Sequence, residues 1–377
     1  MAGTARTEPA VWYASADQAR RRRASTSEAR RPEALEPEAR QKTLVRRQPD
    51  RAQTIRRTAQ VLFLLLNLWI GTRFYFFVRF YETGGQTVWI PRPAGIEGWL
   101  PIAGLMNLKS FVLTGLVPDV HPAGMFLLAS FLGMSWLARK AFCSWLCPVG
   151  TLSEWLWQGG REIFGRNFSA PRWLDLPLRG LKYLVFGFFA WAVSRMSASD
   201  IAAFIQSPYG LVADVKMLNF FRHLGQAGAI TLGVLVVSSV FIQNLWCRYL
   251  CPYGALLGLV ALVSPARIRR DPDACIECAK CANACPSLLP VDTLLSVKSA
   301  ECTTCLECVT ICPAQGALQL TAGRRRAIPA WAVATMIAVV FLGMVSYAKL
   351  AGHWNSAIPD ATYRQLVPAA DSFEHPR

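Results

Sequence analysis

Eight of the twelve cysteines fall into two runs with the same spacing. The first run holds Cys275, Cys278, Cys281 and Cys285, the second holds Cys302, Cys305, Cys308 and Cys312, and a proline follows each run. This C-x2-C-x2-C-x3-C-P pattern is typical of proteins that hold cubane iron–sulfur clusters. Zinc would use these thiolates in a looser pairing, and disulfides would not need the periodic spacing, so both alternatives are weaker. The runs predict two four-iron clusters and one-electron transfer.

The pairing of the ligands follows from the geometry of a cubane. Three cysteines on one tight loop can take three iron corners, and in two-cluster ferredoxins the fourth cysteine of each run binds the other cluster. We therefore assign to cluster 1 the thiols of Cys275, Cys278, Cys281 and Cys312. Cluster 2 is assigned Cys302, Cys305, Cys308 and Cys285.

The remaining four cysteines form two copies of a shorter motif. Cys143 and Cys147, like Cys247 and Cys251, stand in the pattern aromatic-Cys-x3-Cys-Pro-x-Gly, and a Leu-Val-x-Asp-Val sequence precedes each copy. If each pair lies in a helix, its thiols share one face, and a pseudo-twofold arrangement of the two copies brings four thiols together. Four such thiols could hold a third cluster, bind a soft metal such as copper or zinc, act as redox dithiols, or simply pack at helix ends.

Composition points to a membrane. Hydrophobic residues make up 53% of the 377 residues, yet the formal net charge is +16. Because a span needs about 20 mostly apolar residues, we expect five of them, near residues 59–80, 122–142, 179–197, 226–246 and 328–348. A further apolar stretch, 100–118, carries Lys109 between two prolines and is predicted to be an interfacial or re-entrant helix on the outer side.

The charge of the connecting segments predicts the orientation. The N-terminal segment, the segment after the first cysteine pair and the flanks of the ferredoxin runs are basic, which places them in the cytoplasm of a bacterium, below its inner membrane. We expect these basic residues to lie beside membrane lipid. The sequence does not predict nucleic acid as a partner. The predicted domains are a disordered arm, a transmembrane domain, a ferredoxin module, a last transmembrane helix and a periplasmic tail, over residues 1–55, 56–264, 265–326, 327–350 and 351–377.

The predicted fold class is therefore mainly α. We expect a polytopic membrane protein with about five transmembrane helices and a duplicated helical hairpin, into which an α+β two-cluster ferredoxin-like module is inserted. Asp119 and Asp214, with the segment 207–210, could belong to a quinone pocket, although aspartates at such positions are more often turn or cap residues. The histidines, among them His121 and His223 in outer loops, do not predict a membrane haem.

The order of these features resembles a known family. A basic N-terminus, a first span, the proline-rich segment 91–101, two Cys-x3-Cys-Pro copies, a double-cluster run and a last span are together similar to the NapH, NosR and CcoG (FixG/RdxA) membrane polyferredoxins. The resemblance implies electron transfer among the quinone pool, cytoplasmic donors and periplasmic reductases, or maturation of copper enzymes. We expect this chain to lack the flavin-binding domain of the NosR type and the immunoglobulin-like domain of the CcoG type.

The leading hypothesis is thus an electron-transfer component of an oxidoreductase system, with no catalytic residue of its own. It would pass single electrons between the cytoplasmic clusters and the quinone pool or a periplasmic acceptor, with separate redox partner proteins on both sides. One alternative is a copper-handling assembly factor for a periplasmic or membrane metalloenzyme. Another is a redox-sensing membrane regulator.

Overall fold

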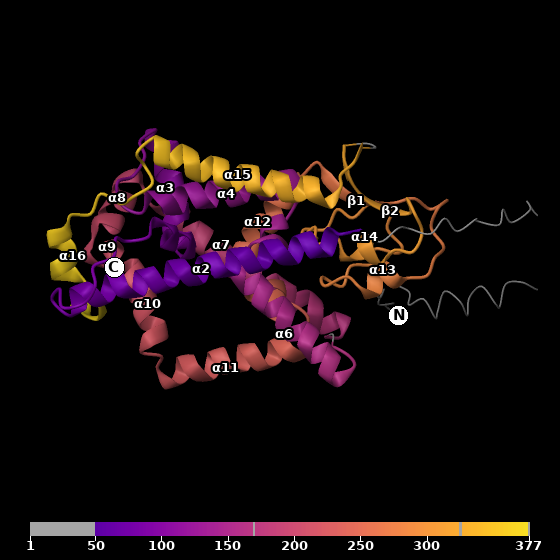
Figure 1. Cartoon of the computed structure of the whole chain (residues 1–377), viewed down its shortest axis with the longest axis horizontal. Helices are drawn as coiled ribbons and strands as arrows, with labels where there is room; N and C mark the ends of the chain where they lie inside the picture. The colour runs from indigo at the N-terminus through magenta and orange to yellow at the C-terminus, as the bar shows by residue number, and fades with distance from the viewer. Residues whose placement is uncertain (1–49, 169, 324–325, 376–377) are drawn as a thin grey trace, which may run out of the picture. The chain divides into compact units, whose positions relative to one another are not determined.

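The computed structural model describes residues 50–168, 170–323 and 326–375, which are mainly helical with one small sheet (Figure 1). The sequence predicts a disordered arm over residues 1–55, and residues 1–49 of it lie outside the described residues. The first described helix, α2, covers Ala52–Glu82 and so begins within the last residues assigned to that arm.

Among the described residues, three helices are long and apolar enough to cross a membrane. They are α2, α7 (Arg172–Arg195) and α15 (Ala330–Leu350), and each covers most or all of one apolar stretch predicted from the sequence. A fourth span results only if α10 (Ala213–Arg222) and α11 (Gln226–Phe241) count as one, and these two helices are bent by 80°. The described residues therefore give three or four candidate spans, and the expected total of five is not confirmed.

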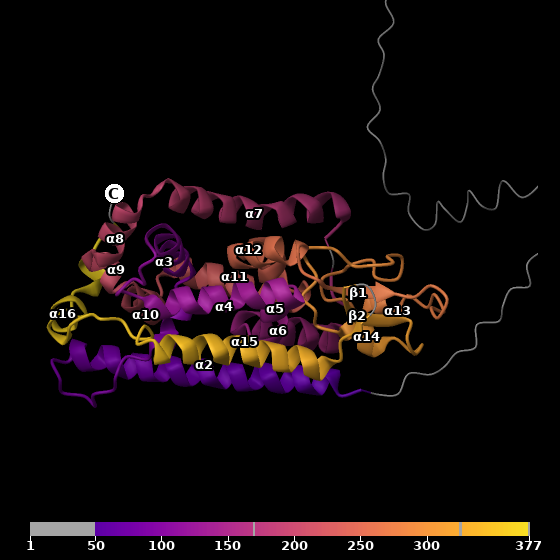
Figure 2. The ribbon, with the colours of Figure 1, turned by 90° about the horizontal axis from the view of Figure 1, so that it is seen from above.

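The predicted span at 122–142 is a shorter helix at the centre of the bundle. Helix α4 covers Pro122–Ala138, and 12 of its 17 residues are buried. It packs against α3 (Pro101–Thr114), α12 (Pro252–Leu262) and α15, and Figures 1 and 2 both show it between α12 and α15. A helix that is apolar all round is expected where protein surrounds it on every side.

The stretch predicted as an interfacial helix forms α3, which starts at a proline and ends at Gly115, whose φ is +73°. The ammonium group of Lys109 in this helix is bound by backbone carbonyl oxygens. Lys109 Nζ donates to the carbonyl oxygens of Val193, Ser194 and Met196, at 2.9, 2.9 and 2.5 Å. These carbonyls lie at the C-terminus of α7, where a helix leaves its last acceptors without partners, so Lys109 caps α7.

A small antiparallel sheet organises the cysteine-rich segment. Strands β1 (Ala266–Arg270), β2 (Leu318–Ala322) and β3 (Arg326–Ala327) pair in that order, with Ile268 opposite Leu320. Two short helices, α13 (Lys280–Asn283) and α14 (Glu307–Ile311), lie between β1 and β2 in the chain. We call residues 265–323 the cysteine module.

The core of the cysteine module is continuous with that of the helices. Met134 of α4 and Trp145, both fully buried, belong to the same apolar cluster as Ile268 and Leu320 of the sheet. Several cysteines of the module pack into this cluster as well. The module and the helical bundle therefore share one core.

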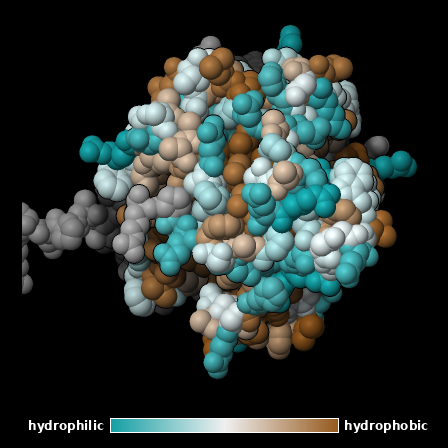
Figure 3. All heavy atoms as spheres, turned by 90° about the vertical axis from the view of Figure 1, so that its left-hand side faces the viewer, coloured by the Kyte–Doolittle hydropathy of each residue, from teal (hydrophilic) through white to brown (hydrophobic). Residues whose placement is uncertain are grey.

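The other end of the helices carries short elements and the C-terminal segment. They are η1 (Ala94–Trp99), α8 (Ala198–Gln206), α9 (Pro208–Leu211), α16 (Asp360–Leu366) and η3 (Ala370–Ser372). The segment predicted as a tail is folded here, because Tyr363 and Val367 pack against Phe77 and Tyr81 of α2. Figure 3 views this end and shows hydrophilic and hydrophobic side chains intermixed on it.

Candidate functional site

Each Cys-x3-Cys-Pro copy is a break between two helical segments. Cys143 lies in α5 (Ala141–Trp145), whereas Cys147 is the N-cap of α6 (Pro148–Phe164). In the second copy Cys247 lies in the short π-helix η2 (Trp246–Leu250), and Cys251 is the N-cap of α12. The structure thus differs from the expected single helical face, because the following proline fits the first turn of a new helix but not the interior of a continuing one.

The glycine of each motif has a steric reason. A Cβ atom on Gly150 would collide with the carbonyl oxygen of Cys143, because the first turn of α6 folds back onto α5. The equivalent position, Gly254, is less crowded, with the carbonyl oxygen of Cys247 at 3.5 Å from a built Cβ. The Pro-x-Gly sequence therefore lets the second helix start directly beside the first cysteine.

The four thiols of the two copies converge on one cavity. Its volume is about 940 Å³, and its lining includes Cys143, Cys147, Cys247 and Cys251. Aromatic rings form much of the wall near these thiols: Phe131 and Phe142 stack at 3.9 Å between centroids, and Tyr253 meets Phe142 edge-on at 6.0 Å. We call this space the thiol cavity.

The backbone around the thiol cavity favours negative charge. The N–H of Gly150 donates to Cys147 Sγ at 3.5 Å, and the N–H of Gly254 donates to Cys251 Sγ at 3.3 Å. Both sulfurs also sit at helix N-termini, where the macrodipole stabilises an anion. Burial acts in the opposite direction and raises the pKa of Cys143 to about 11 and that of Cys147 to about 12.

Among the described residues, no group of three or more His, Cys, Asp or Glu side chains is placed to hold one ion. A mononuclear centre needs its thiolates about 2.3 Å from the same ion, whereas a cubane binds each thiolate at a different iron corner. The four cysteines here are half-buried and line one shared space, which is compatible with the second arrangement.

The cysteine module brings together the ligand set predicted for cluster 2. Cys285, Cys302, Cys305 and Cys308 line one small cavity, although Cys285 belongs to a different run from the other three. Burial raises the pKa of Cys305 to about 12. For cluster 1, Cys281 interacts electrostatically with Cys312, again across the two runs, and Cys278 is exposed. All twelve cysteines lie within the described residues.

Both Cys-x3-Cys loops contact the backbone next to the cluster 2 set. Ser144 Oγ donates to the carbonyl oxygen of Thr303 at 2.6 Å, and Trp145 Nε1 donates to that of Thr304 at 3.1 Å. Thr303 and Thr304 stand between Cys302 and Cys305. From the second loop, Arg248 Nη1 donates to the carbonyl oxygen of Ser287 at 2.8 Å, two residues after Cys285. The thiol cavity and the cluster 2 set are therefore held against each other by direct hydrogen bonds.

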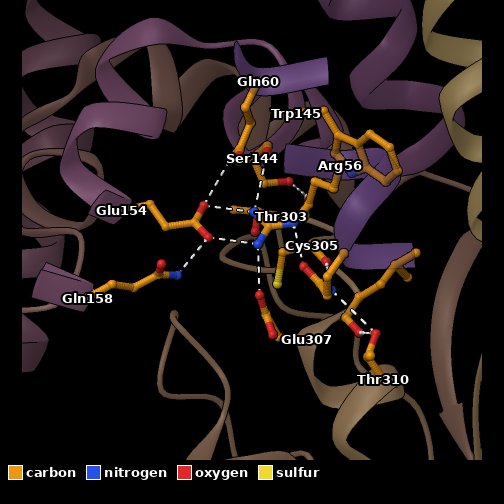
Figure 4. A network of polar contacts seen from close by, with 12 residues as sticks. Arg56, Gln60, Ser144, Trp145, Glu154, Gln158, Thr303, Cys305, Glu307 and Thr310 are labelled. Carbon is orange, nitrogen blue, oxygen red and sulfur yellow. Dashed lines mark hydrogen bonds and ion pairs between the residues drawn. The ribbon is translucent and has the colours of Figure 1, made fainter. Parts of the chain in front are cut away.

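A buried ion-pair network holds the first loop in place, which Figure 4 shows from close by. Arg56 of α2 donates both terminal nitrogens to the carboxylate of Glu154 at 2.7 Å, and one of them also to Glu307 of α14 at 2.7 Å. Gln60 joins the network through Glu154 and the carbonyl oxygen of Ser144, both at 2.9 Å. One arginine thus connects α2, α6 and the cysteine module.

The second loop has an anchor of its own. Asp175 of α7 accepts from Arg248 Nε and Nη2 at 2.9 and 3.0 Å, and from the Tyr249 hydroxyl at 2.7 Å. These anchors were not evident from the sequence. The sequence signal for them is only that Arg56 and Asp175 stand within the first turns of α2 and α7, ahead of the apolar parts of these helices.

A second buried polar cluster lies at the other end of the helices. Arg92 pairs with Glu97 and with Asp214, both at 2.7 Å, and His121 Nδ1 lies 3.4 Å from Glu97 Oε1. Burial alone would raise the pKa of Glu97, but Arg92 and His121 outweigh it and lower this pKa to about 2. Of this cluster only Arg92 lines the thiol cavity; Asp119, Asp214 and the segment 207–210 do not.

Comparison with known proteins follows the same division of the chain. The family described as "4Fe-4S binding domain" matches residues 120–171 and 224–270. These two segments contain the Cys-x3-Cys-Pro copies and none of the ferredoxin runs. The family described as "4Fe-4S dicluster domain" matches residues 267–313, which hold all eight cysteines of those runs.

Relatives exist among curated proteins. The putative electron transport protein YccM of Escherichia coli is 49% identical over 330 residues, which cover 86% of this chain and 92% of YccM. The ferredoxin-type protein NapH of Escherichia coli is 25% identical over 55% of this chain and 70% of NapH. The regulatory protein NosR of Pseudomonas aeruginosa is 28% identical over 49% of this chain and 25% of NosR. No solved structure matches the chain.

Apolar helices of spanning length and two iron–sulfur domain matches define a membrane-bound iron–sulfur protein of electron transfer. Within that class, the chain belongs to the NapH/NosR-type family of 4Fe-4S membrane proteins.

Proposed function

We propose that this chain conducts single electrons between the cysteine module and a lipophilic redox ligand in the thiol cavity. Four-iron clusters, when bound, accept and release one electron at a time. The chain would hold cluster 1 by Cys275, Cys278, Cys281 and Cys312, and cluster 2 by Cys302, Cys305, Cys308 and Cys285. A third cluster would be held by Cys143, Cys147, Cys247 and Cys251.

The observation that carries the proposal is the arrangement of the three cysteine sets in a row. The cluster 1 set contains the exposed Cys278, while Cys285, Cys302 and Cys308 of the cluster 2 set are buried. Cys281 and Cys308 interact across these two sets. The cluster 2 set is hydrogen-bonded through Thr303 and Thr304 to the loop between Cys143 and Cys147. Electrons would therefore enter or leave at the exposed set and exchange with the membrane at the thiol cavity.

Two features of the thiol cavity support a third cluster. Its four cysteines lie in the two segments that match a 4Fe-4S binding domain. Two helix N-termini and two N–H groups face the sulfurs, which suits a cluster of net negative charge.

The size and lining of the thiol cavity support a quinone as the lipophilic ligand. Ligand pockets commonly enclose about 300 to 1,000 Å³ behind mostly apolar walls with a few polar groups. The volume here, about 940 Å³, lies within this range, and its walls are largely aromatic and aliphatic. Such a ligand would reach the thiols from the membrane without crossing water.

Orientation completes the proposal. The basic segments beside α2 and the cysteine module favour the cytoplasmic side of a bacterial inner membrane for both. Exchange on the periplasmic side would then need a separate redox partner protein, and the exposed cluster 1 set would meet a cytoplasmic one.

Iron content tests the central claim. The protein is purified without oxygen, and iron, sulfide, copper and zinc are measured per chain alongside low-temperature paramagnetic resonance. Three four-iron clusters predict about twelve irons, falling to about eight in the variant with both Cys143→Ser and Cys247→Ser. Cys278→Ser is the matched control, because it should remove the signal of a different cluster.

The same measurement separates the proposal from its main rival. About eight irons in the unaltered protein would refute the third cluster. If copper were bound instead, in equal amount with the chain, and were lost in the double variant, the cavity would belong to a metal-handling protein.

A further inference from the structure

Two consecutive cations, Arg139 and Lys140, follow the last residue of α4. Both are buried, with 0% and 3% of their surfaces exposed. Burying a charge is costly unless it is paired and hydrogen-bonded. Neither residue belongs to a cysteine motif, so their burial at this point calls for a separate explanation.

Arg139 occupies a strained and poorly satisfied position. Its φ is +58° and its ψ is −150°, a backbone conformation that is nearly restricted to glycine. Its Nη2 donates to the carbonyl oxygen of Ser299. Within the described part of the chain, its Nε and Nη1 have no hydrogen-bond partner. The guanidinium interacts electrostatically with Cys302, a member of the cluster 2 set.

Lys140 points to the other side. It lines the thiol cavity together with the four cysteines of the Cys-x3-Cys copies. Its Nζ lies 3.5 Å from Glu301 Oε2, and Lys182 Nζ lies 2.6 Å from the other oxygen of the same carboxylate, Oε1. Two lysines thus share one carboxylate, and this buried group carries one excess positive charge.

The physical effect of such cations on a bound cluster has a definite sign. Reduction adds one negative charge to a cluster, and a nearby cation in a low-dielectric interior stabilises the reduced form more than the oxidised form. Arg139 faces the cluster 2 set and Lys140 faces the thiol cavity, so each acts mainly on a different cluster. The strain and the unpaired nitrogens of Arg139 are the cost of holding a charge there.

We propose that Arg139 and Lys140 are tuning residues that raise the reduction potentials of the two clusters on either side of them. Arg139 acts on the cluster held by Cys302 and its set, and Lys140 acts on the cluster in the thiol cavity. No bond forms or breaks; one electron leaves one cluster and enters the other. The role of Lys140 rests on the proposed third cluster, whereas that of Arg139 depends only on cluster 2.

The test is a redox titration of each cluster signal in anaerobically purified protein, followed by paramagnetic resonance. Lys140→Met should lower the potential of the cavity cluster, with at least a tenfold change in its one-electron equilibrium constant, about 59 mV. Arg139→Gln should do the same for cluster 2. Each variant should change the reduction potential of the other cluster less. Arg139→Lys and Lys140→Arg, which keep the positive charge, should show the potentials of the unaltered protein.

Two further variants keep the test decisive. Glu301→Gln removes the shared negative charge and should move the cavity cluster in the opposite direction, to a higher potential. Lys182→Met is the matched control, because Lys182 binds the same carboxylate but does not line the thiol cavity, and its effect should be smaller.

The outcomes separate this inference from the proposed function. About twelve irons per chain with unchanged potentials in Lys140→Met and Arg139→Gln would overturn the tuning role and leave the third cluster standing. About eight irons in the unaltered protein would overturn the third cluster and the role of Lys140 together. The Arg139 variants would then still decide the tuning of cluster 2.

Discussion

Replacing Arg56 with methionine should weaken the contact between α2, α6 and the cysteine module. Methionine keeps much of the length of the side chain but removes its charge and its donors. Only 1% of the Arg56 side chain is exposed, against 9% for Glu154 and 23% for Glu307. The substitution leaves these two carboxylates close together, without the cation that neutralises them.

The expected magnitude follows from this burial. Removing one partner of a buried ion pair typically costs about 3 to 5 kcal/mol, because the remaining charge is desolvated and unpaired. The lower half of this range fits here, since Glu307 keeps some contact with solvent. About 3 to 4 kcal/mol corresponds to a roughly hundred- to thousand-fold larger equilibrium constant for opening.

Amide hydrogen exchange measures this opening directly. Exchange should accelerate by that factor in peptides that cover residues 144–147 and 303–308. The control is Arg364→Met: Arg364 Nε lies 2.6 Å from Asp360 Oδ2, but these side chains are 57% and 53% exposed. Such an exposed pair contributes about 0 to 1 kcal/mol. Acceleration of less than about tenfold in Arg56→Met, or an equal effect in both variants, would refute the reasoning.

Two other perturbations have equally definite outcomes. Gly160→Ala should destabilise the contact of α6 with α11 by about 1 to 3 kcal/mol, since the new Cβ would collide with the carbonyl oxygen of Val240. Gly159→Ala, which meets no atom within 4 Å, should be neutral or slightly stabilising, and a denaturant titration in detergent compares the two. Because the pKa of Glu97 is lowered to about 2, its contribution to stability is complete above its usual pKa near 4.5 and is lost as pH falls toward 2. Amide hydrogen exchange at residues 119–124, corrected for its intrinsic pH dependence, should accelerate on acidification of the unaltered protein. Glu97→Gln should remove most of this pH dependence. An exchange rate that does not change with pH in the unaltered protein would contradict the role given to Arg92.

The sequence was most informative where spacing is dictated by chemistry. A cubane needs thiolates at fixed intervals, so the two ferredoxin runs and the crossed placement of Cys285 could be predicted without a structure. The duplication of the Cys-x3-Cys-Pro motif likewise predicted four converging thiols, and all four line one cavity. The apolar runs of α2, α7 and α15 were long enough to be recognised by length alone.

Features that depend on tertiary packing were beyond the sequence. The stretch at 122–142 is as apolar as a span, but α4 ends at Ala138, and α3, α12 and α15 surround it. The sequence left open whether each cysteine pair lies in one helix or at helix ends, and in the structure Pro148 and Pro252 start new helices there. Arg56 pairs with Glu154 and Glu307, 98 and 251 positions away, and no local pattern indicates such a pairing.

The continuous core between the sheet and α4 has a consequence for how the protein is made. Met134 and Trp145 are buried against the same apolar cluster that contains Ile268 and Leu320, and cysteines of both ligand runs pack into it. Because the two parts share this interior, we expect insertion of iron and sulfide to be a folding step for the helices as well. During biosynthesis, a shortage of assembled clusters would therefore leave unpacked membrane helices as targets for quality-control proteases, and cluster supply would set the abundance of the whole chain.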